Sequence, residues 1–301
     1  MEKVIVTGGV GFIGSNLVDA LIEEGVEVSV IDNQITGKET NINSKAKLHE
    51  VDIRDRSSLE DIFKGGEYVF HTAAIPNVQY SIDNPLETHE VNVTGVLNLL
   101  DVLVKKDAKK FILSSSASVY GENEKELMKE TDEPDPKSPY ALHKYIAEEY
   151  CKLWSKVYGL PTVSLRYFNV YGNRQNVGGY SSLVIAKFLE KRKKGEKLTI
   201  TGDGNQTRDF VHVRDVVRAN ILAARSEDFF SGETINIGSG LSTSVNQIAE
   251  YIGGEVEYID PRFEPKHSLS DNSKAKKLLN WEPSVFIKEG IKELKISEGL
   301  E

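Results

Sequence analysis

The stretch "VTGGVGFIGSN" near the start constrains the fold of this chain more than any other part of it. It places Gly8, Gly11 and Gly14 at the spacing G-x-x-G-x-x-G. The triplet lies between a β-branched run at 3–8 and a segment with helical spacing at 13–24. Glycine permits the backbone angles of such a turn, the approach of a pyrophosphate, and close helix–strand packing. The N–H groups at the helix start then face the phosphates. This context predicts a dinucleotide-binding turn.

Short β-branched runs alternate with helical patterns through the first half of the chain. Strands are predicted at 3–8, 26–32, 68–74, 110–116 and 161–169, and helices at 13–24, 57–64, 86–106 and 139–158. The continuous apolar character of the strands suits a parallel sheet covered on both faces. This order predicts an α/β fold, a Rossmann-type doubly wound parallel sheet with right-handed crossovers.

The alternation becomes less regular after residue 169. Helices are expected at 183–196 and 244–252, a loop at 258–271, and a strand at 234–240 that returns to the first sheet. We therefore expect a smaller, discontinuous C-terminal substrate lobe. The predicted division is a dinucleotide-binding Rossmann domain over 1–168, joined by about 209–239, and a lobe over 169–301, mainly 169–208 and 240–301.

Charge and cysteine content exclude several other classes of protein. The formal charge of −9 leaves no basic excess for nucleic acid or an anionic membrane. Cys151 is the one cysteine, so neither an internal disulfide nor a thiolate cluster for a metal is expected. A strand begins where a signal peptide would need its apolar region, and no apolar run is long enough to span a bilayer. We expect a cytoplasmic protein without a metal site.

Asp32 ends the second predicted strand, 18 residues beyond Gly14. A carboxylate there can accept hydrogen bonds from a ribose diol and would repel a 2′-phosphate. No arginine follows in "DNQITGK", so the pattern favours NAD over NADP. A turn cap is the alternative role for Asp32. In "VDIRD" (51–55), Asp52 and Ile53 are candidates for contacts to the adenine.

Tyr140 and Lys144 in "SPYALHKY" lie one helical turn apart and project from one face. "FILSSSASVYG" places Ser116 at the end of a predicted strand, where ligands of such sheets bind. A lysine ammonium and the cationic nicotinamide would favour the phenolate and lower the pKa of the tyrosine. Tyr140 could then take a proton from a substrate hydroxyl to which Ser116 hydrogen-bonds. An exposed Tyr/Lys pair is the alternative.

These features together resemble the extended short-chain dehydrogenase/reductase family, and within it the nucleotide-sugar epimerases of the UDP-glucose 4-epimerase group. The resemblance extends through essentially the whole chain. It is carried by "TGGVGFIGSNL", "HTAAIPNV", "NVTGVLNLL", "SSSASVYGE", "SPYALHK", "LRYFNVYG", "GDGNQTRDFVHVRDV", "NIGSG" and "HSLSDNSKAKKLLNW".

The resemblance implies a set of functional residues. The catalytic residues would be Ser116, Tyr140 and Lys144, and Asn92 would support the lysine. The NAD contacts would come from Gly8, Gly11, Phe12, Ile13, Gly14, Asp32, Asn33, Asp52, Ile53, Ala73, Ala74, Asn92, Ser114, Tyr140, Lys144 and Tyr167. The substrate contacts would come from Ser116, Tyr140, Asn169, Arg208, Arg262 and Ser268. The two arginines suit a diphosphate, although surface salt bridges are an alternative for both.

Two features narrow the implied reaction. Related dehydratases and decarboxylases carry an acidic residue just after the catalytic Ser/Thr, whereas this chain has Ala117 and Ser118, so epimerisation fits better. Ser268 matches a gate residue beside the sugar, and a serine leaves room for a 2-acetamido group. Two departures from the family pattern are a loop one residue short between Arg262 and Ser268, and Pro76 in place of a lysine near the nicotinamide ribose.

The expected function is therefore an NAD-dependent UDP-hexose 4-epimerase acting on UDP-glucose and UDP-galactose, with the N-acetylhexosamine forms as further substrates. A UDP-glucuronate or UDP-galacturonate 4-epimerase, or another nucleotide-sugar enzyme of this family, is the alternative. A non-catalytic NAD-sensing regulator is the alternative from another class. The helices at 86–106 and 139–158 match those that pair in a four-helix interface in this family, so a homodimer is expected.

Overall fold

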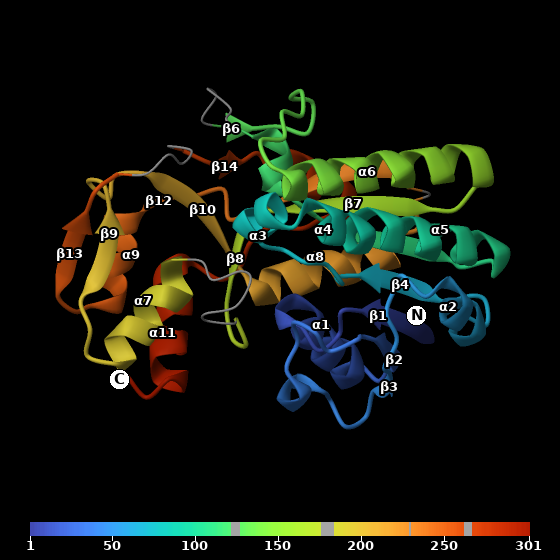
Figure 1. Cartoon of the computed structure of the whole chain (residues 1–301), viewed down its shortest axis with the longest axis horizontal. Coiled ribbons are helices and arrows are strands. Elements are labelled where there is room, and N and C mark those ends of the chain that lie inside the picture. Colours follow the sequence, from blue (N-terminus) through green and yellow to red (C-terminus); the bar gives the residue numbers. More distant parts are fainter. Residues whose placement is uncertain (122–126, 176–183, 229, 262–266) are drawn as a thin grey trace.

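Seven parallel strands form the central sheet, in the order β11-β7-β5-β4-β1-β2-β3 (Figure 1). The computed structural model describes residues 1–121, 127–175, 184–228, 230–261 and 267–301. The strands of this sheet are β1 (Lys3–Thr7), β2 (Glu27–Ile31), β3 (Lys47–His49), β4 (Tyr68–His71), β5 (Lys110–Ser116), β7 (Thr162–Tyr167) and β11 (Ser231–Ile237). Strand β3 is not among the predicted strands, because "KLH" is short and has little β propensity. β11 is the strand expected to return to the sheet, and it pairs with β7.

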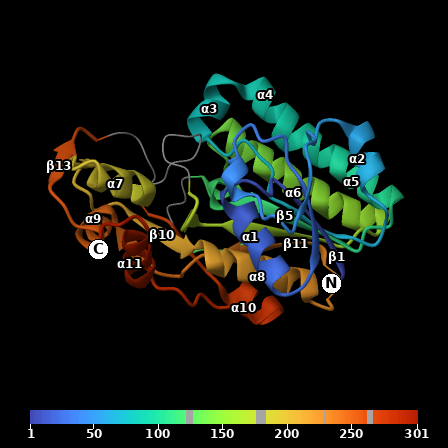
Figure 2. The same ribbon diagram turned by 90° about the horizontal axis from the view of Figure 1, so that it is seen from below.

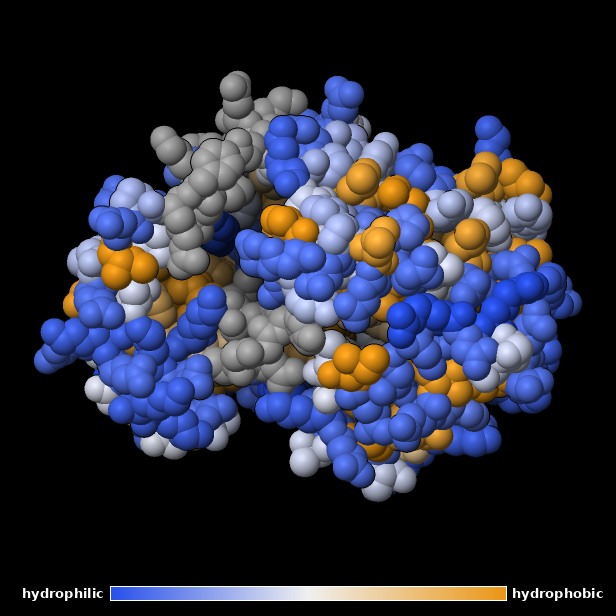
Figure 3. Space-filling view, viewed as in Figure 1, coloured by the Kyte–Doolittle hydropathy of each residue, from blue (hydrophilic) through white to orange (hydrophobic). Residues whose placement is uncertain are grey.

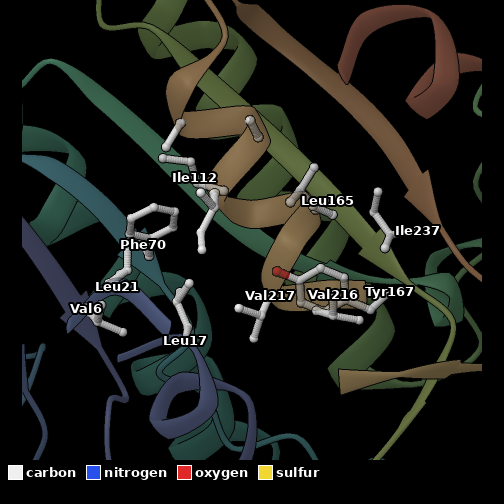
Figure 4. Close-up of a cluster of buried hydrophobic side chains, with 14 of the residues drawn as sticks. Val6, Leu17, Leu21, Phe70, Ile112, Leu165, Tyr167, Val216, Val217 and Ile237 are labelled. Atoms are coloured by element: carbon white, nitrogen blue, oxygen red, sulfur yellow. The ribbon is translucent and has the colours of Figure 1, made fainter. Parts of the chain in front are cut away.

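Helices cover both faces of this sheet, as the apolar strands predict (Figure 2). One face packs on α1 (Phe12–Glu23), α8 (Val213–Arg225) and α10 (Ser273–Leu279), and the other on α2 (Arg56–Ile62), α5 (Gly95–Lys105) and α6 (Pro139–Tyr158). Figure 4 shows part of the first core, in which Leu17 and Val216 lie among strand side chains such as Ile112. The predicted doubly wound fold is confirmed. Within the described residues, each helix is too short or too polar to cross a lipid bilayer.

Smaller sheets and further helices form a second part of the molecule, on the left in Figure 1. A three-stranded sheet contains β8 (Asn169–Tyr171), β10 (Thr207–His212) and β12 (Ser242–Ser244), and β9 (Leu198–Thr201) pairs with β13 (Val256–Ile259). Their core is shared with α7 (Val184–Lys193), α9 (Val245–Ile252) and α11 (Ile287–Ser297). Strand β6 (Leu127–Met128) follows β5 in sequence and pairs with β14 (Leu269–Ser270), so it joins two distant parts of the chain.

Three predicted segments differ in the structure. The strand predicted at 161–169 is divided, because β8 leaves the main sheet after Phe168 and pairs with β10 instead. The helix predicted at 86–106 contains α4 (Pro85–His89), a π-helical turn, η2 (Glu90–Thr94), and α5; the short α3 (Val78–Asp83) precedes it. The loop predicted at 258–271 includes the end of β13 and all of β14. Both strands pair with segments far away in sequence, so no local sequence pattern predicts them.

Candidate active site

The glycine turn between β1 and α1 is closely packed on the loop after β4. Gly8 has φ +73°, and a Cβ on it would lie 2.5 Å from the backbone nitrogen of Ala73. A Cβ on Gly14 would lie 2.2 Å from the carbonyl oxygen of Gly8 and 2.6 Å from Thr72 Oγ1. Gly11 donates its N–H to the Gly8 carbonyl oxygen at 3.1 Å. Only glycine fits at these two positions: at Gly8 both the positive φ and the lack of space exclude a side chain, and at Gly14 the lack of space alone does so.

A cavity of about 360 Å³ opens at this turn, along the carboxyl ends of the strands. The predicted cofactor residues that line it are Gly8, Gly11, Phe12, Ile13, Gly14, Asp32, Asn33, Asp52, Ile53, Ala73 and Ala74. Asp32 is 9% exposed, and its carboxylate accepts hydrogen bonds from Val10 N at 3.0 Å and Gln34 N at 2.8 Å. Burial raises its pKa. A carboxylate has about four lone-pair sites, so Asp32 can still accept from a ribose diol. These residues fit NAD.

Asp52 organises the far wall of the same cavity. It accepts Arg54 Nε at 2.9 Å and Nη2 at 2.7 Å, and Asn33 Nδ2 at 2.8 Å. The hydrogen bonds from Arg54 lower the pKa of Asp52 to about 2. Arg54 also lines the cavity and is absent from the predicted residues, although it belongs to the same "VDIRD" segment. The pair gives this wall a fixed polar surface.

Helix α6 brings the predicted proton-transfer residues to the end of β5. Ser138 caps the helix by accepting from Ala141 N at 3.2 Å, and Pro139 begins its first turn. Lys144 Nζ donates to the Ser114 carbonyl oxygen at 2.7 Å and lies 6.0 Å from the ring centroid of Tyr140. The Ser116 side chain interacts with the Tyr140 hydroxyl and lowers its pKa. The three predicted residues therefore meet.

The pKa of Tyr140 differs in direction from the predicted value. Burial raises it above the ordinary value of a tyrosine, and the hydrogen bond with Ser116 opposes part of this effect. Burial also lowers the pKa of Lys144 to about 8, although the nearby Glu148 carboxylate acts in the opposite direction. The pKa rises because the phenol is withdrawn from water, and the lowering by the lysine and the cationic nicotinamide stays a prediction. Formation of the phenolate here depends on positive charge beside the ring.

Three residues predicted to contact the cofactor have other contacts in the structure. Tyr167 is 7% exposed and lies in the core (Figure 4), where its hydroxyl contacts Ser114 Oγ at 3.1 Å and Asn220 Nδ2 at 2.8 Å. Asn92 Nδ2 donates to the Ile75 carbonyl oxygen at 3.0 Å, and its Oδ1 accepts from Ile75 N at 2.9 Å. Asn92 therefore supports the cavity loop, and its side-chain hydrogen bonds go to that loop instead of Lys144. Tyr167, Asn92 and Ser114 do not line the cavity, and neither do Tyr140 and Lys144, the other two residues predicted to contact the cofactor there.

The predicted substrate residues of the second part lie on neighbouring elements. Asn169 begins β8, and its Nδ2 donates to the Asp209 carbonyl oxygen of β10 at 2.9 Å. Arg208 precedes Asp209 on β10, and its Nη1 donates to the Thr207 carbonyl oxygen at 2.9 Å. Ser268 has a buried hydroxyl with no hydrogen-bond partner among the described residues. Arg262 lies outside the described residues.

Asp209 is a buried carboxylate that the sequence analysis does not identify. It is fully buried and accepts five hydrogen bonds: Ser239 N at 2.5 Å, Ser239 Oγ at 2.7 Å, Gly240 N at 3.0 Å, Ser270 N at 3.0 Å and Ser270 Oγ at 2.6 Å. It therefore joins β10 to the turn after β11 and to β14, two residues from Ser268. Its position directly after Arg208 is the one sequence signal that points to it.

Comparison with known proteins gives consistent matches over the whole chain. The model of the NAD dependent epimerase/dehydratase family matches residues 4–238. A putative UDP-glucose 4-epimerase of Methanocaldococcus jannaschii is 43% identical over 297 residues, which cover 96% of each chain.

Solved structures agree with this match. The UDP-glucose 4-epimerase of Thermotoga maritima, crystallised with UDP-glucose, superposes with a TM-score of 0.92 at 42% identity, over 99% of this chain and 100% of that one. The UDP-N-acetylglucosamine 4-epimerase of Methanobrevibacter ruminantium M1, in complex with UDP-N-acetylmuramic acid, has a TM-score of 0.91 at 38% identity, over 98% and 99% of the two chains.

Proposed function

Since this chain belongs to the NAD dependent epimerase/dehydratase family, we propose that it is a UDP-hexose 4-epimerase that interconverts UDP-glucose and UDP-galactose. The resemblance predicted from the sequence motifs is confirmed by these relatives. NAD is the cofactor of the family, and the glycine turn and Asp32 supply a cavity that fits it.

One observation carries the choice of reaction. The Ser116 side chain interacts with the Tyr140 hydroxyl, and the two residues that follow Ser116 are Ala117 and Ser118 at the start of the 3₁₀ turn η3 (Ala117–Tyr120). Ser118 N donates back to Ser116 Oγ at 3.2 Å. An elimination would need a second acid/base group beside the sugar, and this turn offers no carboxylate. One proton-transfer residue suffices for reversible oxidation and reduction at a single carbon.

The site residues divide the proposed work between them. Tyr140 Oη takes the proton of the sugar 4-hydroxyl group and later returns it to the same oxygen. Ser116 Oγ hydrogen-bonds with that oxygen, and Lys144 holds positive charge beside the phenol while Ser114 orients its ammonium group. When bound, NAD supplies the hydride acceptor and donor for C4. Asn92 holds the loop at Ile75, which forms part of the cavity wall.

The proposal also assigns regions and substrates. Residues 1–168, joined by about 209–239, would bind NAD, and 169–208 with 240–301 would bind the nucleotide sugar. Asn169, Arg208 and Arg262 would contact the diphosphate, which suits arginine because its guanidinium pairs with phosphate oxygens. Ser268 would leave room for a 2-acetamido group, and the 38% identical UDP-N-acetylglucosamine 4-epimerase supports this extension.

Conversion of UDP-glucose to UDP-galactose, without added coenzyme, tests the function. The purified protein is incubated with each sugar nucleotide and the products are separated by chromatography. Tyr140→Phe should lower kcat by about 100-fold or more, because it removes the acid/base group. Tyr145→Phe, on the same helix, is the matched control and should retain activity. Full activity of Tyr140→Phe would refute the mechanism.

A panel of nucleotide sugars separates the alternatives. Faster turnover of UDP-glucuronate or UDP-galacturonate would favour the uronate epimerase, and turnover of UDP-N-acetylglucosamine would extend the substrate range. A non-catalytic NAD-sensing regulator would turn over none of them while still binding NAD.

The proposal includes a homodimer formed through α4–α6. Helix α6 carries exposed apolar side chains at Leu142, Leu153 and Val157, with exposed fractions of 44%, 48% and 58%, and Leu86 of α4 is 82% exposed. Figure 3 shows hydrophobic side chains over this part of the surface. Such a row suits a helix-pairing interface. Gel filtration showing a monomer would contradict the dimer. A cytoplasmic location remains a prediction from the sequence.

A further inference from the structure

Three residues of α6, each one turn after the last, bind three consecutive residues of β5. The Tyr140 hydroxyl interacts with the Ser116 side chain, and Lys144 donates to the Ser114 carbonyl oxygen at 2.7 Å. The third contact continues the row, since Ser115 Oγ donates to Glu148 Oε1 at 2.5 Å. Residues four apart on a helix share a face, so 140, 144 and 148 form one stripe against the strand end. The first two are the proposed acid/base and its lysine, whereas the third has no role so far.

Glu148 is held more firmly than its two neighbours on the stripe. It is fully buried and forms a two-pronged ion pair with Arg166, whose Nε and Nη2 lie 2.9 Å and 2.6 Å from the carboxylate oxygens. Arg166 is 2% exposed and lies on β7, directly opposite Ser115. Its guanidinium also stacks 4.6 Å from the ring centroid of Tyr120. The carboxylate therefore ties α6 to two adjacent strands at once.

We propose that Glu148 is a positioning residue of this site. It anchors α6 on the end of β5, so that Tyr140 and Lys144 meet their partners, and its negative charge keeps Lys144 in the ammonium form. The proposal rests on the epimerase function proposed above, because it assigns Glu148 a task in that reaction. It reaches the reacting atoms only through Lys144 and Tyr140.

The charges around Lys144 explain why a carboxylate is needed there. The titratable and charged groups around it are Tyr140, His143 and Glu148 of its own helix and His71 of β4. Beyond these, Arg166 of β7 pairs with Glu148, and the His89 ring of α4 contacts His143. Burial lowers the pKa of both His71 and His143, to about 3 and about 4, so neither histidine adds charge at neutral pH. Glu148 is then the anion that balances two buried cations.

Removal of this anion has a predictable consequence. Arginine keeps its proton under all ordinary conditions, so Arg166 stays charged. Lys144 is therefore the group that loses its proton when Glu148 becomes neutral. Tyr140 would then lack the ammonium that favours its phenolate.

The test is the pH profile of kcat for UDP-glucose in Glu148→Gln. The alkaline limb should move to lower pH by about one unit, which is a tenfold loss on that limb, while KM changes little. The phenolate absorbance of Tyr140, taken as the difference from Tyr140→Phe, should appear at higher pH than in the wild type. Glu149→Gln is the matched control, because Glu149 is exposed and pairs only with Lys152 at 2.6 Å among the described contacts. Both profiles should be unchanged in it.

A second variant keeps the test decisive if Glu148→Gln fails to fold. Glu148→Gln/Arg166→Gln removes both charges and leaves a neutral pair, so its alkaline limb should lie between those of the wild type and Glu148→Gln. The proposal would be overturned if a folded variant of either kind had the same alkaline limb of the kcat profile, and the same phenolate titration of Tyr140, as the wild type. If the wild type turns over no nucleotide sugar, the proposed function fails, and the phenolate titration still decides the role of Glu148.

Discussion

Replacement of Asp209 by asparagine should destabilise the second part of the molecule. The carboxylate is fully buried and accepts five hydrogen bonds, two on Oδ1 from Ser239 and three on Oδ2 from Gly240 and Ser270. An amide offers one oxygen and one NH₂ group. In the orientation that keeps more of the hydrogen bonds, the amide oxygen of the asparagine takes the Oδ2 position. Its NH₂ group then takes the Oδ1 position and faces the backbone N–H of Ser239. The Ser239 hydroxyl can turn to accept, whereas the N–H cannot.

The magnitude follows from these contacts. One buried backbone N–H left without an acceptor costs about 1–3 kcal/mol of folding free energy, and the remaining hydrogen bonds lose the extra strength that a charged acceptor gives. Release of a buried charge offsets part of this loss. We expect the free energy of unfolding to fall by about 2–4 kcal/mol in total. The KM for UDP-sugars should also rise, because Asp209 holds Ser270 near the proposed gate residue Ser268.

Urea denaturation followed by circular dichroism measures the change in unfolding free energy. Asp203→Asn is the matched control, since Asp203 lies in an exposed turn and accepts Asn205 N at 2.9 Å. We expect it to change stability by no more than about 0.5 kcal/mol, as for most surface substitutions. An Asp209→Asn protein as stable as this control would refute the view that the five bonds anchor these strands.

Three further predictions concern the cofactor cavity and its pH dependence. Gly14→Ala places a Cβ 2.2 Å from the Gly8 carbonyl oxygen, so α1 must shift. Calorimetry should then show the affinity for NAD reduced by about tenfold or more, equivalent to about 1.4 kcal/mol. An affinity equal to that of the wild type would contradict this. Asn92→Ala removes both hydrogen bonds to Ile75. It should lower the free energy of unfolding by about 1–3 kcal/mol and weaken NAD binding. Unchanged stability and NAD affinity would show that these two hydrogen bonds are dispensable. Because burial lowers the pKa of Lys144 to about 8, the ammonium is lost above that pH, so kcat should decline above pH 8. A profile that stays level to about pH 10, the ordinary lysine range, would be inconsistent with this role.

The residues that the sequence predicts well have local determinants. Gly8, Gly11 and Gly14 belong to one strand–turn–helix unit, and Asp32 ends the neighbouring strand. Each is identifiable because parallel strands end at a common edge and glycine has a distinct backbone freedom. Tyr140 is also local, since a helix of period 3.6 places it on one face with the lysine a turn later.

Contacts between segments distant in sequence determine the surroundings of the other site residues. Asn220, 53 residues away, and Ser114 hold the Tyr167 hydroxyl in the core, and the contact of this residue with the cofactor stays a prediction. The π-helical turn around Asn92 directs that side chain to Ile75. The residue spacing in "NVTGVLNLL" does not predict the extra residue that this turn contains.

The two buried carboxylates show the same division most clearly. From the sequence, Glu148 is an acidic residue in a predicted helix and Asp209 is one in a segment with no predicted strand or helix, and solvent exposure is the usual outcome for such residues. Only the fold brings Arg166 and Ser115 to the first, and Ser239 and Ser270 to the second. The sequence by itself determined the doubly wound sheet, the glycine turn and the Tyr140–Lys144 pair, because period and spacing act within a few residues. The charge environment of that pair required the tertiary structure, because a buried charge is stabilised by partners that the chain supplies from remote positions.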